Sequence, residues 1–255
     1  MSTPLPTGSL VELAARKQLP HHQFTDHATL RWIESNRPDF PDDSPLLLRS
    51  ASQRLLHRCA LPAHWLAEPK TTDSLHGIRH GMRTAVLAAL LAESAGMDEE
   101  DTATLIVAAA VHDCRRLHDK DDRGHGARAA RWLTENQDTV WSHFGLTPIP
   151  RHVGRAAVAV RLHDLPYAAF SADDRADHAR SEQISDLLKA ADALDRYRLP
   201  KLSWWPDSAH VRANAFDQLR TTAFDLVVSS EAAHLAGAES AEAVFTALEQ
   251  RELIT

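Results

Sequence analysis

The residues of this chain that are best suited to chemistry are the adjacent His112 and Asp113. They end an apolar run over residues 105–111 that is hydrophobic on all sides, which is typical of a helix buried in a helical core. A buried imidazole and a buried carboxylate are destabilising unless a partner satisfies them. Because a divalent metal ion satisfies both groups at once, the pair predicts a metal site at the end of this helix.

Two further residues with side chains that can bind a metal lie on separate predicted helices. His80 heads a stripe at the i, i+4, i+7, i+11 spacing of one helix face and therefore faces inward. Asp192 lies near the end of an amphipathic stretch over residues 181–196. The family resemblance described below implies that these two residues join His112 and Asp113 in a mixed N/O ligand set, which would suit Mn, Fe, Co, Ni, Zn or Mg and leave coordination positions open. A buried, hydrogen-bonded His/Asp cluster without a metal is the alternative interpretation.

His125 and His163 also fall on inward-facing stripes, although the four-ligand site does not require them. His125 shares its face with Ala129 and Leu133, and His163 follows an apolar stripe in residues 153–160. For both we favour substrate contact or general-acid chemistry, because the N–H groups of a helix that opens at His125 can bind phosphate beside the ring. Ligation of a second metal ion and packing in the core are the alternatives. One ion is therefore favoured and two are possible.

Arg83 and Arg116 lie about one helical turn from predicted ligands. A guanidinium can hold two phosphate oxygens, so both are candidate substrate contacts and Arg116 is also a candidate catalytic residue. An ion pair with Asp119 or Asp122 is an equally good interpretation. Asp195 is expected to orient a ligand or to cap its helix.

The elements that must position these residues are helices. Gly is sparse, Ala-rich stretches are frequent and no run shows the alternation of a strand, so we expect an all-α protein. An N-terminal helical extension over residues 1–70, a metal-binding core over residues 71–200 and C-terminal helices over residues 201–255 are expected to form one compact unit. Trp204 and Trp205 are expected to anchor the tail to the core in preference to stacking on a base.

Three finer expectations concern local structure. Asp73 or Ser74 is expected to cap the helix that carries His80. The C-terminal region is expected to contain two helices, around residues 209–236 and 241–253. Six histidines lack consistent inward neighbours and are expected at the surface: His118, His143, His152, His178, His210 and His234.

The composition narrows the function classes. The net charge of −7 argues against a general nucleic-acid binder, but it allows a small phosphorylated substrate that meets a few local Arg residues. Cys59 and Cys114 form no spaced motif, so no disulfide framework is expected. The first residues lack a signal-peptide pattern, and no apolar run approaches the roughly 20 residues that a bilayer needs. We therefore expect a cytoplasmic protein without a membrane contact.

In this order and on successive helices, His80, His112, Asp113 and Asp192 resemble the ligands of the HD superfamily of metal-dependent phosphohydrolases. Three motifs are similar to those of a little-characterised bacterial branch of that superfamily: His76-Gly-x-x-His80-x-x-Arg83, His112-Asp-x-x-Arg116-Leu and x-His125-Gly. The likeness covers about residues 74–198. It implies an HD-type helical bundle in which the four residues bind a divalent metal.

The resemblance also implies an activity, the hydrolysis of a small phosphoester, for which a nucleotide is the favoured substrate. A metal ion can turn its bound water into the nucleophile, so no Ser or Cys nucleophile is required. A non-catalytic, metal-stabilised binding or regulatory protein is the main alternative. A di-iron HD oxygenase, which needs extra His ligands, is a less favoured one.

Overall fold

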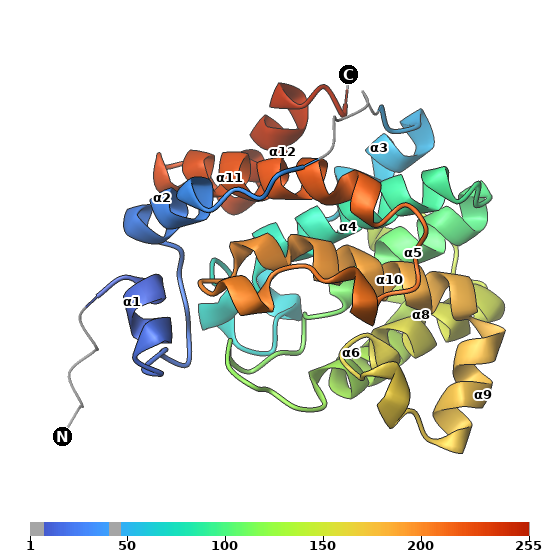
Figure 1. The fold of residues 1–255 in the computed structure, drawn as a ribbon. Helices are drawn as coiled ribbons and strands as arrows, with labels where there is room; N and C mark the ends of the chain where they lie inside the picture. Colours follow the sequence, from blue (N-terminus) through green and yellow to red (C-terminus); the bar gives the residue numbers. More distant parts are fainter. Residues whose placement is uncertain (1–7, 41–46, 255) are drawn as a thin grey trace.

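A computed structural model describes residues 8–40 and 47–254, and these residues form helices and turns but no strand (Figure 1). The α-helices are α1 (Leu10–Ala15), α2 (His27–Ser35), α3 (Ser50–Leu56), α4 (Ile78–Ser94), α5 (Glu99–Val111), α6 (His125–Glu135), α7 (Gln137–His143), α8 (Pro150–Leu162), α9 (Ala172–Arg180), α10 (Glu182–Leu194), α11 (Arg220–Leu235) and α12 (Ser240–Gln250). Short 3-10 helices lie between them: η1 (Ala63–Trp65), η2 (Pro69–Thr71), η3 (Tyr167–Ala169), η4 (Asp195–Arg198), η5 (Leu202–Trp204), η6 (Ser208–His210) and η7 (Asp217–Leu219). The all-α prediction is confirmed. Across this described part of the chain, no helix combines the length and the apolar character that crossing a membrane requires.

Helices α4 and α5 form the centre of the molecule. Both are rich in Ala, and α4 is also rich in Leu; these residues are strong helix formers. Residues 79–92 and 104–111 are buried on every side of their helices. Helix α10 packs on α4 and α8, α8 packs on α5 and α6, and the pair α11 and α12 packs on α4 (Figure 1). One hydrophobic cluster extends from Ile33 in α2 to Leu253 after α12. The described parts of all three predicted regions therefore share a core.

Two glycines allow helices to approach each other closely beside predicted ligands. A Cβ atom at Gly81 in α4 would lie 3.0 Å from the carbonyl oxygen of Ala110 in α5. A Cβ atom at Gly126 in α6 would lie 2.7 Å from the carbonyl oxygen of Val160 in α8. Because glycine has no Cβ, each helix pair can close without a clash. The residue before each glycine is a histidine, so each close approach brings an imidazole to the neighbouring helix.

The predicted cap of α4 is wrong. The helix begins at Ile78, and Gly77 occupies the N-cap position without a side-chain hydrogen bond. Ser74 instead donates its hydroxyl hydrogen bond to Asp119, and the Asp73 carboxylate accepts one from Ser240 in α12. Both polar side chains are therefore used in long-range contacts that a local capping pattern does not reveal.

The C-terminal region also differs in part from its expectation. Helix α12 is confirmed, but α11 begins at Arg220, and residues 208–219 contain the short turns η6 and η7 with an irregular segment between them. The Asp207 carboxylate accepts the N–H of Ala209, which ties the chain into a tight turn where a helix was expected.

Two histidines expected at the surface, His152 and His178, are buried. His178 Nε2 lies 2.7 Å from the Asp186 carboxylate, which also accepts a hydrogen bond from the Tyr167 hydroxyl. Burial of that ring is possible because a charged acceptor satisfies it. The other four histidines of that group keep partly or fully exposed side chains.

Candidate metal centre

Three of the four predicted ligands form one donor group where α4, α5 and α10 meet. The Nε2 atoms of His80 and His112 lie 3.0 Å apart, and Asp192 Oδ1 lies 3.4 Å from the first and 3.8 Å from the second. All three ligand atoms lie within 4.8 Å of one another, which is close enough to hold one ion. The metal-ligand prediction for these residues therefore has the geometry that it needs.

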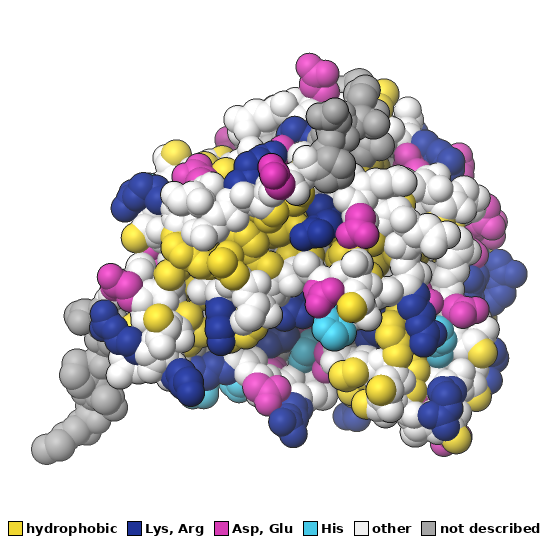
Figure 2. All heavy atoms as spheres, viewed as in Figure 1, with side chains coloured by type: hydrophobic (Ala, Val, Ile, Leu, Met, Phe, Trp, Pro, Cys, Tyr) yellow, Lys and Arg dark blue, Asp and Glu magenta, His cyan; other side chains and the backbone are white. Residues whose placement is uncertain are grey.

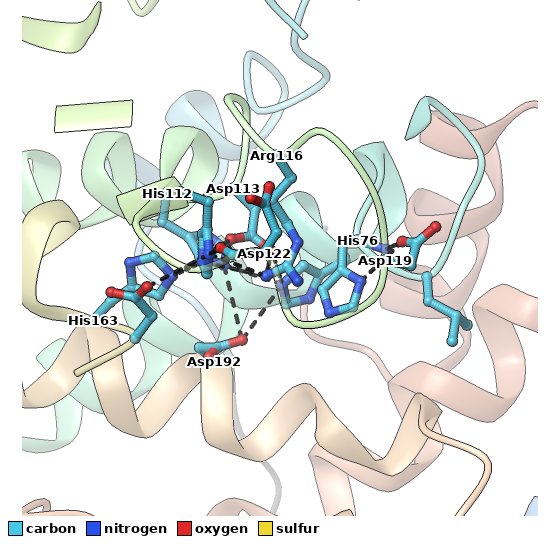
Figure 3. Close-up of polar contacts among 12 residues, drawn as sticks. His76, His112, Asp113, Arg116, Asp119, Asp122, His163 and Asp192 are labelled. Carbon is cyan, nitrogen blue, oxygen red and sulfur yellow. Dashed lines mark hydrogen bonds and ion pairs between the residues drawn. The ribbon is translucent and has the colours of Figure 1, made fainter. Parts of the chain in front are cut away.

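Asp113, the fourth predicted ligand, stands between this group and a second one. Its Oδ2 atom lies 3.5 Å from His80 Nε2, whereas its Oδ1 atom lies 3.0 Å from His125 Nε2 and 3.4 Å from His163 Nε2. The Nε2 atoms of His125 and His163 are themselves 3.0 Å apart. His80, His125 and His163 thus lie around the Asp113 carboxylate, and His112 Nε2 lies 3.9 Å from Asp113 Oδ1. Figure 3 shows Asp113 together with His112, His163 and Asp192.

The four histidine rings share one hydrogen-bonding pattern. Each Nδ1 lies 2.7–2.8 Å from an oxygen that can only accept: Asp195 Oδ2 for His80, the Ala109 carbonyl for His112, the Asp122 carbonyl for His125 and the Val160 carbonyl for His163. Each Nδ1 therefore carries the ring proton, and in the neutral ring the Nε2 atom keeps its lone pair. Three of these oxygens are carbonyls three residues earlier in the chain, so the position of the ring at a helix end sets its tautomer.

The Nε2 lone pairs of these rings point at one another in two pairs. An unprotonated nitrogen pair at 3.0 Å is repulsive, so each pair requires a proton or a cation between its members. Burial lowers the pKa of His112 to about 3, which disfavours the proton in the first pair. A divalent cation is the partner that suits the imidazoles and the carboxylates together.

The carboxylates of the centre are ionised. Burial opposes their charge, but Arg116 and neighbouring histidines hold the pKa of Asp113 well below its usual range, and His80 and His112 lower the pKa of Asp192. For His125, burial again opposes the charged form, whereas the Asp113 carboxylate raises its pKa. The centre therefore offers negative oxygen atoms to a cation.

Asp195 has the orienting role that the sequence suggested, and Arg83 has a different environment from the predicted one. Asp195 accepts from His80 Nδ1 at 2.8 Å and from Arg83 Nε at 2.6 Å. Arg83 is buried, and it also donates to Ser230 and Glu231 in α11. Because these partners occupy its guanidinium, Arg83 does not line a substrate pocket. It holds Asp195, which in turn contacts the predicted ligand His80.

Arg116 lies between the candidate metal centre and the adjoining pocket. Its Nη1 atom is 3.5 Å from Asp113 Oδ2 and 3.2 Å from His125 Nε2 (Figure 3). The alternative ion pairs with Asp119 and Asp122 are not formed, because Asp119 binds His76 and Asp122 binds Arg128. Arg116 Nε donates to the His118 carbonyl and Nη2 donates to the Lys120 carbonyl, so Nη1 is the part of the guanidinium that faces the centre and a substrate oxygen there.

Two residues beside the centre were not assigned a role from the sequence. His76 Nδ1 lies 2.9 Å from Asp119 Oδ1, and its ring packs edge-on against His80 with ring centroids 5.6 Å apart. Arg198 is buried, donates through Nε to the Leu75 carbonyl and places Nη2 3.4 Å from His80 Nε2. The His-Gly dipeptide at residue 76 could have drawn attention to the first of them. No local signal marks Arg198, which follows α10 on the turn η4.

A pocket of about 590 Å³ adjoins the centre, and His76 and Arg116 form part of its wall. The other residues around it come from the end of α1, from the segment that follows Arg116 and from the segment after η4. Comparison of the chain with protein-family models, with curated proteins and with solved structures finds no match.

Proposed function

We propose that this protein is a metal-dependent phosphohydrolase that acts on a small phosphoester. The observation that carries the proposal is the convergence of the Nε2 atoms of four imidazoles on the carboxylates of Asp113 and Asp192. Asp113 faces His80 through Oδ2 and faces His125 and His163 through Oδ1, and a carboxylate placed between two sets of donors suits two ions better than the single ion favoured by the sequence pattern. When bound, such ions polarise a phosphoryl oxygen and acidify water.

The residues around the centre suit an anionic substrate. Arg116 can donate to a phosphate oxygen at the edge of the cluster, and Arg198 adds a second buried positive charge beside His80. Cys114 directly follows the His-Asp pair, but burial raises the pKa of its thiol, which makes it a poor nucleophile near neutral pH. These features support water, and not a side chain, as the attacking group.

Metal content and phosphate release test the proposal together. We expect the chelator-treated chain to release no phosphate from a panel of phosphomonoesters, and Mn²⁺ or Co²⁺ to restore release. Asp113→Asn should lower both the metal content and the rate by at least about a hundredfold, since this carboxylate faces both donor groups. Asp225→Asn, on α11 and paired with Arg251, is the control and should behave like the unchanged protein. Metal-loaded protein that hydrolyses none of the panel would contradict the proposal.

A di-iron oxygenase is a second candidate, because that chemistry needs histidine ligands beyond the first four and the structure supplies His125 and His163. Metal analysis separates the two candidates. Strict dependence on iron together with oxygen consumption would favour the oxygenase, whereas phosphate release with Mn²⁺ in the absence of oxygen would favour the phosphohydrolase.

A further inference from the structure

Most residues that line the pocket beside the candidate metal centre lie outside the segment from His80 to Asp192, which contains the predicted metal ligands. The residues of its wall on which the inference depends are Lys17, His76, Arg116, Lys120, Lys201 and Trp204. Its volume of about 590 Å³ lies within the range of sites for small organic ligands. Lys and Arg side chains gather around the end of α1 on the corresponding part of the surface (Figure 2).

The inner end of the pocket reaches the metal centre through two residues. Arg116 contacts both Asp113 and His125, and the His76 ring packs on His80. A molecule that fills the pocket therefore presents its inner end to the proposed metal site. Because Arg116 is a cation there, that end is expected to be anionic.

The N-terminal segment is fastened to this pocket by hydrogen bonds. The buried Asp119 carboxylate accepts from the His76 ring, from the Ser74 hydroxyl and from the N–H of Gln23. The backbone of Gln23 also accepts from the N–H of Leu75, and the His21 carbonyl accepts from the N–H of Asp119. The wall formed by the end of α1 is thereby held at a fixed distance from the metal centre.

The two adjacent tryptophans have different roles. Trp205 is the anchor that the sequence suggested: its Nε1 donates to the Leu199 carbonyl, and its ring contacts Trp32, Tyr197 and Phe224. Trp204 makes none of these ring contacts and faces the pocket, with the Lys201 ammonium 5.3 Å from its ring centroid. An indole on a pocket wall offers a flat surface on which an aromatic ring can stack.

Lys17 has an unusual backbone conformation. Its φ angle is 59°, and it follows the last turn of α1, where the N–H of Gln18 donates to the Leu13 carbonyl at 2.8 Å. Glycine is the usual residue at this position of a helix end, because a side chain is strained there. A lysine nevertheless occupies this position and forms part of the pocket wall. Asp119 and Asp121 also line the pocket, but they pair with His76 and Arg123. Within residues 8–40 and 47–254 no ion pair joins Lys17, Lys120 or Lys201 to a carboxylate, so their charges remain available to a ligand.

From this geometry we infer that the pocket takes a phosphomonoester that carries a planar aromatic ring. The ring stacks on Trp204, the lysines attract the anion, and the phosphate lies at Arg116. The inference rests on the proposed function for the position of the phosphate. It makes Trp204 and Lys17 the residues that determine substrate choice.

Adenosine 5′-monophosphate and ribose 5-phosphate test this inference, because they share the phosphate and the sugar and differ by the ring. In the metal-loaded full chain, Trp204→Ala should lower kcat/KM for the first compound about tenfold and change kcat/KM for the second by less than twofold. Trp204→Phe should retain most of the activity. Leu202→Ala, an exposed position on the same turn η5, is the matched control and should change neither value.

A binding measurement makes the result independent of turnover. The phosphonate analogue of adenosine 5′-monophosphate, in which a methylene group replaces the ester oxygen, should bind the metal-loaded chain in calorimetry and lose about tenfold in affinity with Trp204→Ala. If neither phosphate is released but this binding is seen, the inference stands and the proposed function fails. Equal effects of Trp204→Ala on both substrates, or no binding of the phosphonate, would overturn the inference.

Lys17→Gly distinguishes a ligand contact from a structural role. Glycine removes the backbone strain, so the Tm should stay equal or rise, whereas the KM for adenosine 5′-monophosphate should rise severalfold. Lys17→Arg should keep the low KM, since it keeps the charge. A lower Tm with an unchanged KM in Lys17→Gly would contradict the assignment of Lys17 to the ligand.

Discussion

At the scale of single residues, the chemistry depends on which nitrogen of each imidazole carries the proton. Backbone carbonyls fix this choice for His112, His125 and His163, so no side-chain substitution can alter it there. His80 is different because its Nδ1 partner is the side chain of Asp195. The orientation of this one ligand can therefore be tested by mutation.

We expect Asp195→Asn to weaken metal binding about 10–100-fold, because an amide can donate to Nδ1 and so move the ring proton to Nε2. Equilibrium dialysis with Mn²⁺ measures the affinity, and circular dichroism checks the fold. Asp186→Asn is the control, since it removes a similar His–Asp contact at His178. Equal affinities in Asp195→Asn and the unchanged chain would show that Asp195 does not set the tautomer.

At the scale of elements, the centre exists because helix ends meet. His112 and His163 are the C-cap residues of α5 and α8, and His125 is the first residue of α6. Helices α6 and α8 can meet closely only where Gly126 faces the Val160 carbonyl. The second donor group thus depends on a packing contact as much as on its ligands.

Gly126→Ala should force α6 and α8 apart and lower the free energy of unfolding by about 1–3 kcal/mol, because its Cβ would lie 2.7 Å from a backbone oxygen. Metal content per chain should fall as well, since the His125 and His163 rings separate. Gly154→Ala in α8 meets no atom within 4 Å and should instead stabilise the helix by up to about 1 kcal/mol. Unchanged metal content in Gly126→Ala would show that the close approach is unnecessary.

At the scale of the whole molecule, a buried chain of charges connects the C-terminal helices to the metal centre. Glu231 in α11 accepts hydrogen bonds from Arg79 and Arg83 of α4. Arg83 also donates to Asp195, which contacts His80. Arg79 also donates to Ser240 at the start of α12. Helices α11 and α12 thereby help to hold the ligand-bearing helix α4 in position.

This network predicts an acid-dependent loss of stability. Burial opposes the charge on Glu231, but Arg79 and Arg83 lower its pKa to about 2. A lowered pKa in the folded state means that the stabilisation is complete above the ordinary pKa of 4.5 and is lost as the pH falls from there toward 2. Glu231→Gln should therefore cost about 3–5 kcal/mol near neutral pH, and its unfolding free energy should depend less on pH between 4.5 and 2. Urea titrations at several pH values measure both, and parallel pH profiles would contradict the assignment.

The sequence by itself determined the helical class and many residues of the candidate metal centre. A 3.6-residue periodicity reports which side of a helix is buried, so the inward positions of His80, His125 and His163 could be predicted from their neighbours. The end of an apolar run likewise predicted the buried pair His112 and Asp113. These properties are local, because each depends on residues within a few turns of the same helix.

Only the tertiary structure decided how these faces meet. The partners of Arg83 lie on α11 and at Asp195, just after α10, and those of Asp119 lie at residues 23 and 74–76. These partners are too far away in the sequence for helical periodicity to predict them. Trp204 and Trp205 differ in their surroundings because aromatic rings from distant segments pack around Trp205, whereas Trp204 lies on the pocket wall. Ion pairs and pocket walls form between elements that are far apart in the chain, so their partners depend on how the helices pack and not on local sequence.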